Sequence, residues 1–367
     1  MSTQDEADQT ILRHRLPDAV APIAHALLLQ ENVGAARRID LTDLPLTIGR
    51  APTNGLVLSS PDISRQHCCL TLAGDAVVLT DLRSTNGVYV DGVRAQDATR
   101  LHPRARIAIG PYSLVYQRGS AAELQAAERE AREQARAVSY VRALLPAPLH
   151  QGNLRAEWRF EPSAQLGGDA FGYRWLDEAR FALFLLDVSG HGIGSALLAA
   201  SAANTLRGRV LGADPADPVA VLRATNAAFQ MEDHDGLFFS LWYGVFDHRS
   251  RRLSYASAGH HPAYLLSGSK LAPLATRGPC IGMMPAARFE VAETHVVPSA
   301  SLYLFSDGAF EVTRADGRPG EIGDLLALLT QERSDRSEPD RLFDAIRDLT
   351  GRRPFDDDVC LMTLEFQ

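Results

Sequence analysis

The sequence predicts a multidomain protein in which an all-β domain, a helical linker and a mixed α/β domain follow one another. Three observations support this prediction. The chain has 367 residues, whereas a single hydrophobic core stops growing at about 250–300 residues. Residues 20–118 contain short β-forming runs, and residues 150–367 mix apolar strands with helices. Between them, residues 121–145 contain no Gly or Pro, which favours a continuous helix.

Composition and charge narrow the classes of function. Hydrophobic residues make up 46% of the chain and charged residues 22%, which is typical of globular proteins. The formal net charge is −8, and residues 150–367 carry the whole excess, with 29 acidic and 21 basic residues. Nucleic-acid binding usually needs a basic patch. The charge therefore predicts no nucleic-acid partner.

Several features together predict a cytoplasmic location and no membrane partner. Residues 1–10 are polar and acidic, unlike a signal peptide, and residues 1–19 are expected to be poorly ordered. The most apolar stretch, residues 181–206, is interrupted by Asp187 and by glycines, whereas a bilayer span needs about 20 mostly apolar residues. The cysteines form no CxxC pattern, so the sequence predicts neither a zinc site nor a disulfide framework. This favours a reducing compartment. The cysteines are Cys68, Cys69, Cys280 and Cys360.

Residues 20–118 are expected to form a β-sandwich. Gly, Pro, Asn and Asp separate short runs that are rich in β-forming residues. The runs are residues 27–30, 46–48, 56–58, 68–72, 77–79, 88–90, 106–109 and 113–116. Gly74-Asp75 and Asp91-Gly92 each stand between two runs, so we expect two hairpin turns there.

Three short motifs lie at predicted loops of this domain. They are Ile48-Gly49-Arg50, Ser64-Arg65-Gln66-His67 and Ser84-Thr85-Asn86-Gly87. Together they supply a guanidinium group, hydroxyl groups and a side-chain amide beside a glycine turn, which are groups that bind phosphate. In this order and spacing they resemble the forkhead-associated (FHA) domain, over about residues 25–117.

This resemblance implies a phosphothreonine-binding domain at residues 20–118, with a phosphothreonine-containing protein as its partner. The residues implied to bind the phosphopeptide are Arg50, Ser64, Arg65, Thr85 and Asn86. Arg50 and Ser64 are expected to hold the phosphate, and the other three to contact the peptide backbone. The residues implied to be architectural are Gly49, His67 and Gly87. His67 by itself would also allow a catalytic base, but the motif favours a structural hydrogen-bonding role.

Residues 119–145 form the predicted linker. A helix over residues 121–145 would be about 37 Å long at 1.5 Å per residue. Its heptad spacing allows a coiled-coil seam and a homodimer, whereas the alternative is a helix that packs on its own domain. Both interpretations stay open. The seam positions are Leu124, Ala127, Ala131, Gln134, Val138, Val141 and Leu145.

The remaining residues, 146–367, are expected to combine strands and helices. Apolar runs predict strands at residues 181–187, 240–246, 253–258, 302–306 and 359–366. Helices are expected at residues 195–210, 218–230 and 339–349. This pattern is typical of an α/β or α+β domain.

Aspartates stand at the ends of the predicted strands, next to small residues. Asp169 follows two glycines, Asp187 ends the run FALFLL, and Asp307 follows the run LYLFS. Asp357 lies in an acidic triplet before the last strand. A carboxylate at the end of a buried strand is costly unless it is paired or bound to a cation. One Asp-Gly alone would be read as a turn, but four such sites with oxygen ligands predict Mg²⁺ or Mn²⁺.

The order of these motifs resembles the SpoIIE-type branch of the metal-dependent protein phosphatases (PPM family), from about residue 144 to residue 366. The matching motifs are Leu144-Leu145-Pro146, Glu161-Pro162, Leu166-Gly167-Gly168-Asp169, Asp187-Val188-Ser189-Gly190-His191-Gly192, Phe238-Phe239-Ser240, Ala258-Gly259-His260-His261-Pro262, Ser306-Asp307-Gly308 and Asp357-Asp358-Val359. The resemblance implies an α/β/β/α layered fold and a serine/threonine protein phosphatase. Ser306 and Cys360 depart slightly from the usual pattern, and neither departure removes a ligand.

The same resemblance implies two Mn²⁺ or Mg²⁺ ions per active site. The implied metal ligands are Asp169, Asp187, the Val188 carbonyl, Asp307 and Asp357, and Asp187 and Asp307 are also the implied catalytic residues. Two such cations would activate a water for attack on phosphorus. Two roles stay open for His191: it is either a general acid or a residue that shapes the loop. For His260 and His261, packing at a strand end is favoured over metal binding.

The resemblances together imply a phosphatase of bacterial signalling, for example one that acts on a phosphorylated anti-sigma-factor antagonist. The alternative is a non-catalytic adaptor, an FHA reader on a phosphatase-like fold. That alternative predicts that metal carboxylates are missing, whereas all of them are present in the sequence. A two-metal nuclease or cyclase finds no support, because the domain is acidic and has no phosphate-gripping P-loop.

Overall fold

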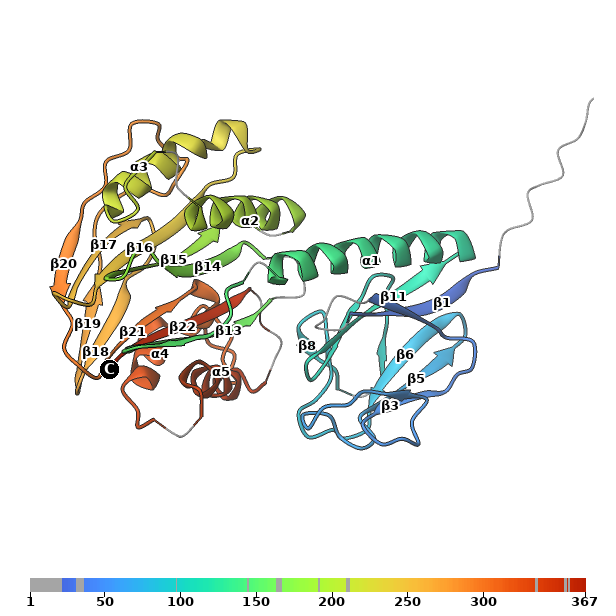
Figure 1. Cartoon of the computed structure of the whole chain (residues 1–367). Helices are drawn as coiled ribbons and strands as arrows, with labels where there is room; N and C mark the ends of the chain where they lie inside the picture. Colours follow the sequence, from blue (N-terminus) through green and yellow to red (C-terminus); the bar gives the residue numbers. More distant parts are fainter. Residues whose placement is uncertain are drawn as a thin grey trace, which may run out of the picture.

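The computed structural model describes residues 22–30, 36–96, 98–143, 145–162, 167–190, 192–208, 212–333, 336–352, 355 and 357–367. Two β-rich domains are joined by one long helix, α1 (Ala121–Ala143), as Figure 1 shows. Among the helices of these residues, none combines the length and the apolar character that crossing a bilayer requires.

The N-terminal domain is a sandwich of two sheets. One sheet has the order β2-β1-β11-β10-β7-β8. Its strands are β1 (Ala24–Gln30), β2 (Ala36–Asp40), β7 (Tyr89–Val90), β8 (Val93–Arg94), β10 (Arg106–Ile109) and β11 (Tyr112–Gly119). The other has the order β4-β3-β5-β6-β9. Its strands are β3 (Leu46–Gly49), β4 (Leu56–Val57), β5 (Cys68–Ala73), β6 (Ala76–Asp81) and β9 (Ala98–Arg100).

Both predicted hairpin turns are present in this sandwich. Ala73 pairs with Ala76 across a two-residue loop, in which Gly74 has a φ of 66°. Val90 pairs with Val93 in the same way. Between them Asp91 and Gly92 both have positive φ, which is the conformation of a type I′ hairpin turn.

The C-terminal domain has four layers. One sheet, of order β14-β15-β16-β17-β20, is covered by α2 (Ile193–Arg207) and α3 (Pro218–Ala228). The other, of order β12-β13-β22-β21-β18-β19, is covered by α4 (Ile322–Leu329) and α5 (Glu338–Leu349). The two sheets face each other across the main core, with one helical pair on each outer side (Figure 1). The predicted α/β/β/α layering is therefore confirmed.

The strands of these two sheets have the following bounds. The first sheet consists of β14 (Asp169–Trp175), β15 (Arg180–Val188), β16 (Phe239–Asp247), β17 (Arg252–Ala258) and β20 (Ala292–His295). The second consists of β12 (Leu149–Gln151), β13 (Leu154–Glu161), β18 (Ala263–Ser267), β19 (Lys270–Leu274), β21 (Ala300–Phe305) and β22 (Val359–Phe366).

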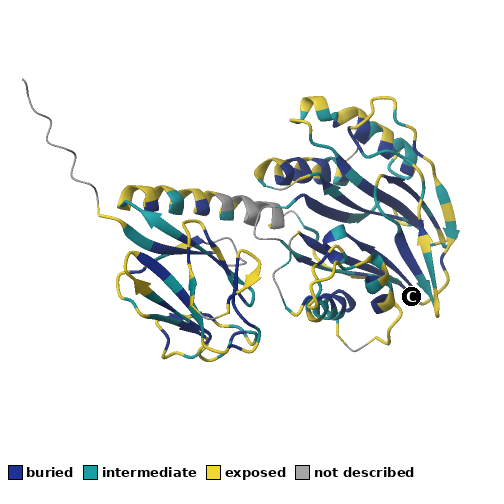
Figure 2. Ribbon diagram, turned by 180° about the vertical axis from the view of Figure 1, so that it is seen from behind, coloured by how far each residue is buried: buried dark blue, intermediate teal, exposed yellow. Residues whose placement is uncertain are grey.

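Strand β15 explains why the run FALFLL has no polar residue. Successive side chains on a strand point to opposite faces of the sheet. Phe181 and Leu183 pack into the core between the two sheets, whereas Phe184 and Leu186 pack beneath the helices. Figure 2 shows this sheet as an almost continuous buried layer. Because both faces are covered, every position before Asp187 has to be apolar.

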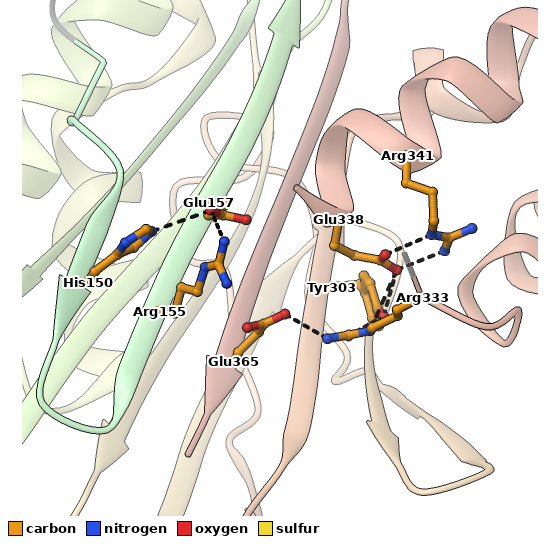
Figure 3. Close-up of polar contacts among 8 residues, drawn as sticks. All are labelled: His150, Arg155, Glu157, Tyr303, Arg333, Glu338, Arg341 and Glu365. Atoms are coloured by element: carbon orange, nitrogen blue, oxygen red, sulfur yellow. Dashed lines mark hydrogen bonds and ion pairs between the residues drawn. The ribbon is translucent and has the colours of Figure 1, made fainter. Parts of the chain in front are cut away.

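A polar cluster attaches α5 to the second sheet (Figure 3). Glu338, at the start of α5, is 4% exposed and accepts hydrogen bonds from Arg341 (2.7 Å) and from the Tyr303 hydroxyl (3.1 Å). Arg333 extends the cluster to Glu365 on β22, at 2.6 Å. A buried carboxylate is stable only when it is paired and hydrogen-bonded. The cluster therefore fixes the position at which α5 starts on the sheet.

Helix α1 packs on the N-terminal domain along its first half. Leu124 is 4% exposed, and Ala131 is buried against Leu28 and Ala36 of the sandwich. Ala131 thus has apolar partners within the chain, which supports the alternative of a helix laid on its own domain. A coiled-coil seam elsewhere on this helix stays a prediction. The side chains of Gln134, Val138 and Val141 lie outside the described residues.

Candidate metal centre and phosphopeptide site

The first sheet of the C-terminal domain places two aspartates side by side. Strand β14 begins at Asp169 and runs antiparallel to β15, so Asp169 lies directly opposite Asp187. Asp169 is 3% exposed and Asp187 is half-buried. Two adjacent carboxylates that lose water repel each other. This pair therefore needs a positive partner to be stable in its ionised form.

The second sheet contributes Asp307 and Asp357, at the point where β21 ends and β22 begins. The fully buried Ser306 hydroxyl joins the two strand ends. It donates to the Asp358 carbonyl at 3.1 Å and accepts from the Cys360 amide at 3.0 Å. Asp307 follows directly and starts a short 3-10 turn. Ser306 thus determines where the acidic residues leave this sheet.

Three glycines let these loops approach each other closely. A Cβ on Gly168 would lie 2.5 Å from the Val188 carbonyl oxygen, and a Cβ on Gly167 would overlap the Asp358 carboxylate. A Cβ on Gly308 would lie 2.1 Å from the Asp358 carbonyl oxygen. Real Cβ atoms do not come this close to backbone oxygens, so only glycine fits. The Gly-Gly-Asp and Asp-Gly patterns are therefore needed to assemble the site.

Burial and mutual repulsion raise the pKa of the carboxyl groups. Burial is the main cause for Asp187, and acidic neighbours follow it. In decreasing order these neighbours are Asp307, Asp357, Asp358 and Glu311. Burial also raises the pKa of Asp169 well above its ordinary value, with Asp187 as the next cause. The pKa of Asp307 is raised by burial and then by Asp357. The site thus concentrates negative charge.

This donor set fits a hard divalent cation. Carboxylate and carbonyl oxygens are the ligands that Mg²⁺ and Mn²⁺ prefer. The buried Oδ2 atom of Asp169 has no hydrogen-bond partner within the described residues, so a cation would satisfy it. Among the described residues, no three acidic, histidine or cysteine side chains form a group placed to hold a metal ion.

Each predicted metal ligand lies at this edge of the two sheets. The charges of Asp169, Asp187, Asp307 and Asp357 interact, and the Val188 carbonyl packs against Gly168. Leu166, His191 and Asp356 of the predicted motifs lie outside the described residues. Asp358 and Glu311 belong to the predicted metal motifs but were not among the predicted ligands, and the structure places both near Asp187. Their signal was available, since both lie one helical turn or less from a predicted ligand.

The histidine pair is a packing feature in this structure. His260 and His261 are half-buried, and their ring centroids are 4.2 Å apart. The His261 ring stacks on Phe305 at 4.8 Å. Burial lowers the pKa of His260 to about 3, so this imidazole is neutral. These contacts support the predicted packing role at a strand end.

In the N-terminal domain, three loops carry the predicted phosphopeptide residues. The Thr85 amide donates to the Ser64 hydroxyl oxygen at 3.0 Å, which brings the second and third motifs together. The Arg50 amide donates to the Ser64 carbonyl at 3.0 Å, which adds the first motif. The side chains of Arg50 and Arg65 are exposed. Two guanidinium groups are thus available to a ligand beside a fixed hydroxyl group.

His67 links the loops of Ser64 and Gly87 from inside the domain. Its side chain is fully buried. Nδ1 accepts from the Ser64 amide at 3.2 Å, so Nε2 carries the proton and donates to the Gly87 carbonyl at 2.9 Å. Burial lowers the pKa of His67. A neutral, doubly hydrogen-bonded imidazole is structural, which agrees with the predicted role.

Comparison with protein families agrees with both parts of the chain. Residues 177–367, more than half of the chain, match the family described as Stage II sporulation protein E (SpoIIE). Residues 46–110 match the FHA domain.

Curated relatives and solved structures match the same two parts. The phosphoserine phosphatase RsbP of Bacillus subtilis is 28% identical over 172 residues, which are 46% of this chain and 43% of that protein. The FHA domain-containing protein FhaB of Mycolicibacterium smegmatis is 35% identical over 88 residues, 24% of this chain and 57% of that protein. The chain thus spans only about half the length of these relatives.

Two solved structures share the fold of the C-terminal domain. The SiaA-PP2C domain of Pseudomonas aeruginosa has a TM-score of 0.51 and 20% identity, and the match covers 58% of this chain and 86% of that one. The RsbU and RsbW domains of a Mycobacterium tuberculosis protein have a TM-score of 0.51 and 23% identity, with 61% and 62% covered. The layered sheets, the aspartates at one edge of these sheets and the family match all agree. The chain belongs to the SpoIIE family, with an FHA domain in front of the SpoIIE region.

Proposed function

We propose that this protein is a metal-dependent phosphoserine and phosphothreonine protein phosphatase whose FHA domain binds a phosphothreonine-containing protein. The observation that carries this proposal is the set of carboxylates at one edge of the two sheets, where burial and mutual repulsion raise the pKa of Asp169, Asp187 and Asp307. The similarity to the phosphoserine phosphatase RsbP supports the reaction class.

The proposed ligands of two Mn²⁺ or Mg²⁺ ions are Asp169, Asp187, the Val188 carbonyl, Asp307 and Asp357. Bound cations would lower the pKa of a water and neutralise phosphoryl oxygens. The protein's own part is to hold these oxygens in place: strand pairing positions Asp169 against Asp187, and Ser306 positions Asp307. Asp187 and Asp307, which face acidic groups from both sheets, are the proposed catalytic residues.

The cysteines argue against a thiol nucleophile. Burial raises the pKa of all four thiols, including half-buried Cys280 and the fully buried Cys360. A catalytic cysteine needs a lowered pKa, because the thiolate is the nucleophile. All four are free, which also supports a reducing cytoplasm as the proposed location.

The test of the enzyme proposal is turnover by the full chain. After treatment with EDTA the protein should hydrolyse phosphoserine and phosphothreonine proteins only when Mn²⁺ or Mg²⁺ is added. The variant Asp187→Asn should lose turnover while its circular dichroism spectrum stays unchanged. If wild type with excess Mn²⁺ is no faster than Asp187→Asn on a panel of phosphoproteins, the adaptor alternative replaces the enzyme.

The reader function has its own test. Charge-assisted hydrogen bonds to phosphate are strong, and loss of one charged partner typically costs about 2–5 kcal/mol. Arg50→Ala should therefore weaken binding of a phosphothreonine peptide more than tenfold in calorimetry. Arg100→Ala is a matched control, because Arg100 is an exposed arginine of the same domain that pairs with Asp75. Equal affinity of wild type and Arg50→Ala would refute the site assignment.

The proposal extends to the substrate and the oligomeric state. A phosphorylated anti-sigma-factor antagonist is the proposed substrate, on the strength of the SpoIIE-type motifs. A homodimer through α1 would not use the side chain of Ala131, which already packs against Leu28 and Ala36 of the FHA domain. Sedimentation at several concentrations tests the dimer, and a single monomeric species would exclude it.

A further inference from the structure

One carboxylate joins the proposed phosphopeptide loop to the phosphatase domain. Asp62 lies between β4 and β5, two residues before Ser64. Its carboxylate pairs with Arg347, Oδ2 to Nη1 at 3.2 Å, and also with Arg352. The side chains of Asp62 and Arg347 are each 17% exposed. Salt screens such partly buried pairs less than surface pairs, so this contact is suited to hold the two domains together.

The two arginines lie at the C-terminal end of α5, where the chain turns back. The Arg352 amide donates to the Arg347 carbonyl at 2.8 Å, and the Thr350 hydroxyl donates to the same carbonyl at 2.8 Å. Arg352 has a φ of 62°, a conformation that is uncommon for a residue with a side chain. This turn directs both guanidinium groups to Asp62. Asp357, a proposed metal ligand, follows Arg352 by five residues.

Asp62 is also tied to the ligand site through its backbone. The Asn86 side-chain amide donates to the Asp62 carbonyl at 2.8 Å. Asn86 is one of the residues proposed to bind the peptide backbone. A small hollow beside it is lined by Asn86, Tyr89 and Gly110 of the FHA domain and by Arg347 and Arg352. A peptide that takes over the Asn86 amide would compete with the bond that orients the Asp62 loop.

We infer that Asp62 is a docking residue that holds the FHA ligand loop against the phosphatase domain, and that docking and phosphopeptide binding oppose each other. In the docked state Asn86 holds the Asp62 loop, and the loop holds both arginines. In the ligand-bound state the peptide uses Asn86, and the loop loses that support. Linkage makes the effect reciprocal, so undocking increases the affinity for the peptide. The opposition between docking and phosphopeptide binding rests on the proposed reader function, whereas the docking contact itself does not.

The same residues allow a second arrangement, in which Arg347 and Arg352 bind an acidic group of the peptide directly. The paired state of both arginines favours docking, because Asp62 already occupies them. The two arrangements predict opposite changes in peptide affinity for the same variant. Removal of two positive charges beside an anionic peptide weakens its binding if they contact it, but strengthens it if they hold the loop closed.

The deciding experiment uses the full chain with Arg347→Gln and Arg352→Gln together, and calorimetry with a phosphothreonine peptide. Docking predicts an affinity at least about fivefold higher than that of wild type, within the usual range of coupling between sites. A lower or unchanged affinity overturns the proposal. Arg100→Gln with Arg118→Gln is the matched control, since both of these pair with Asp75 inside the FHA domain. In an Asp62→Asn background the Arg347 and Arg352 substitutions should have no further effect.

A second measurement keeps the docking contact testable without a ligand. Hydrogen exchange followed by mass spectrometry should show faster exchange of residues 58–64 in the Arg347→Gln and Arg352→Gln variant than in wild type. Unchanged protection would contradict docking, whatever the peptide does. If wild type binds no phosphothreonine peptide, the reader function fails, and this measurement still decides the docking contact. Circular dichroism establishes that the variant is folded.

Discussion

The two candidate sites are built in opposite ways. In the FHA domain, Ser64, Thr85 and His67 satisfy one another by hydrogen bonds, and the charged side chains of Arg50 and Arg65 stay exposed. In the phosphatase domain, carboxylates of both sheets are gathered with raised pKa values and with a buried Asp169 oxygen that has no hydrogen-bond partner among the described residues.

Because of this difference, substitutions in the two sites should affect ligand binding and protein stability to different degrees. A site whose polar groups already satisfy each other is complete before its ligand arrives, so changes to it should affect mainly affinity. A site that concentrates buried charge is incomplete by itself, because desolvated carboxylates destabilise the fold until a cation balances them. Changes to the second site should therefore alter activity, stability and the response to metal together.

The largest effect is expected from Asp307→Asn. This variant removes a proposed metal ligand, and turnover with saturating Mn²⁺ should fall by more than about 100-fold, since even residues that only support a ligand are typically worth 10–100-fold. Asp316→Asn is the matched control, because Asp316 is an exposed carboxylate that pairs with Arg318. Comparable rates of the two variants would contradict the assignment of Asp307.

Gly168→Ala should have the next largest effect. The added Cβ would lie 2.5 Å from the Val188 carbonyl oxygen, which is backbone and cannot turn away. We expect a loss of about 1–3 kcal/mol in the free energy of unfolding, as for other overpacked sites. Gly323→Ala is the control, because nothing lies within 4 Å of its added Cβ. Denaturant titration compares the two, and equal stabilities would show that the loops can move apart.

The stability of the protein in EDTA should depend on pH. The folded-state pKa of Asp187 is raised above its ordinary value of 3.8, so the folded state binds more protons than the unfolded state above that pH. Stability should then fall as pH rises from about 4 toward neutral, by up to about 1.4 kcal/mol per pH unit for one group. Thermal melts between pH 5 and pH 8 measure this, and Asp187→Asn should show a weaker dependence.

The smallest effect on stability is expected from Thr85→Val. Thr85 is exposed; its amide makes the 3.0 Å bond to Ser64, and its hydroxyl only accepts a longer bond of 3.4 Å from the Ser64 hydroxyl. The free energy of unfolding should change by less than about 0.5 kcal/mol, while affinity for a phosphothreonine peptide falls. A large loss of stability with unchanged affinity would reverse the roles assigned to the two sites.

The sequence was most informative where one pattern decides both structure and chemistry. The run before Asp187 predicted a strand over residues 181–187, and the structure has β15 at Arg180–Val188. The aspartates could be placed because each follows or precedes such a strand. Helix α4 (Ile322–Leu329) was not predicted, because eight mostly apolar residues are too short to show helical periodicity.

Contacts between distant residues could not be predicted in the same way. Asp62 and Arg347 are 285 residues apart, and neither belongs to a motif. The heptad spacing of α1 left open what covers its apolar face, and in the structure Ala131 packs on the sandwich, since small apolar side chains fit a sheet as well as a second helix. Periodicity shows that a face is apolar, but only the tertiary structure shows what covers it.

Thermal unfolding of wild type and Asp187→Asn, each with EDTA and with Mn²⁺, tests the central claim most directly. We predict that Mn²⁺ raises the midpoint of wild type, because ligand binding stabilises the folded state. Asp187→Asn should unfold at a higher temperature than wild type in EDTA, since it removes a destabilising buried charge, and should respond little to Mn²⁺. A wild-type midpoint that Mn²⁺ does not change, together with a lower midpoint for Asp187→Asn in EDTA, would contradict the account of these carboxylates as a cation site.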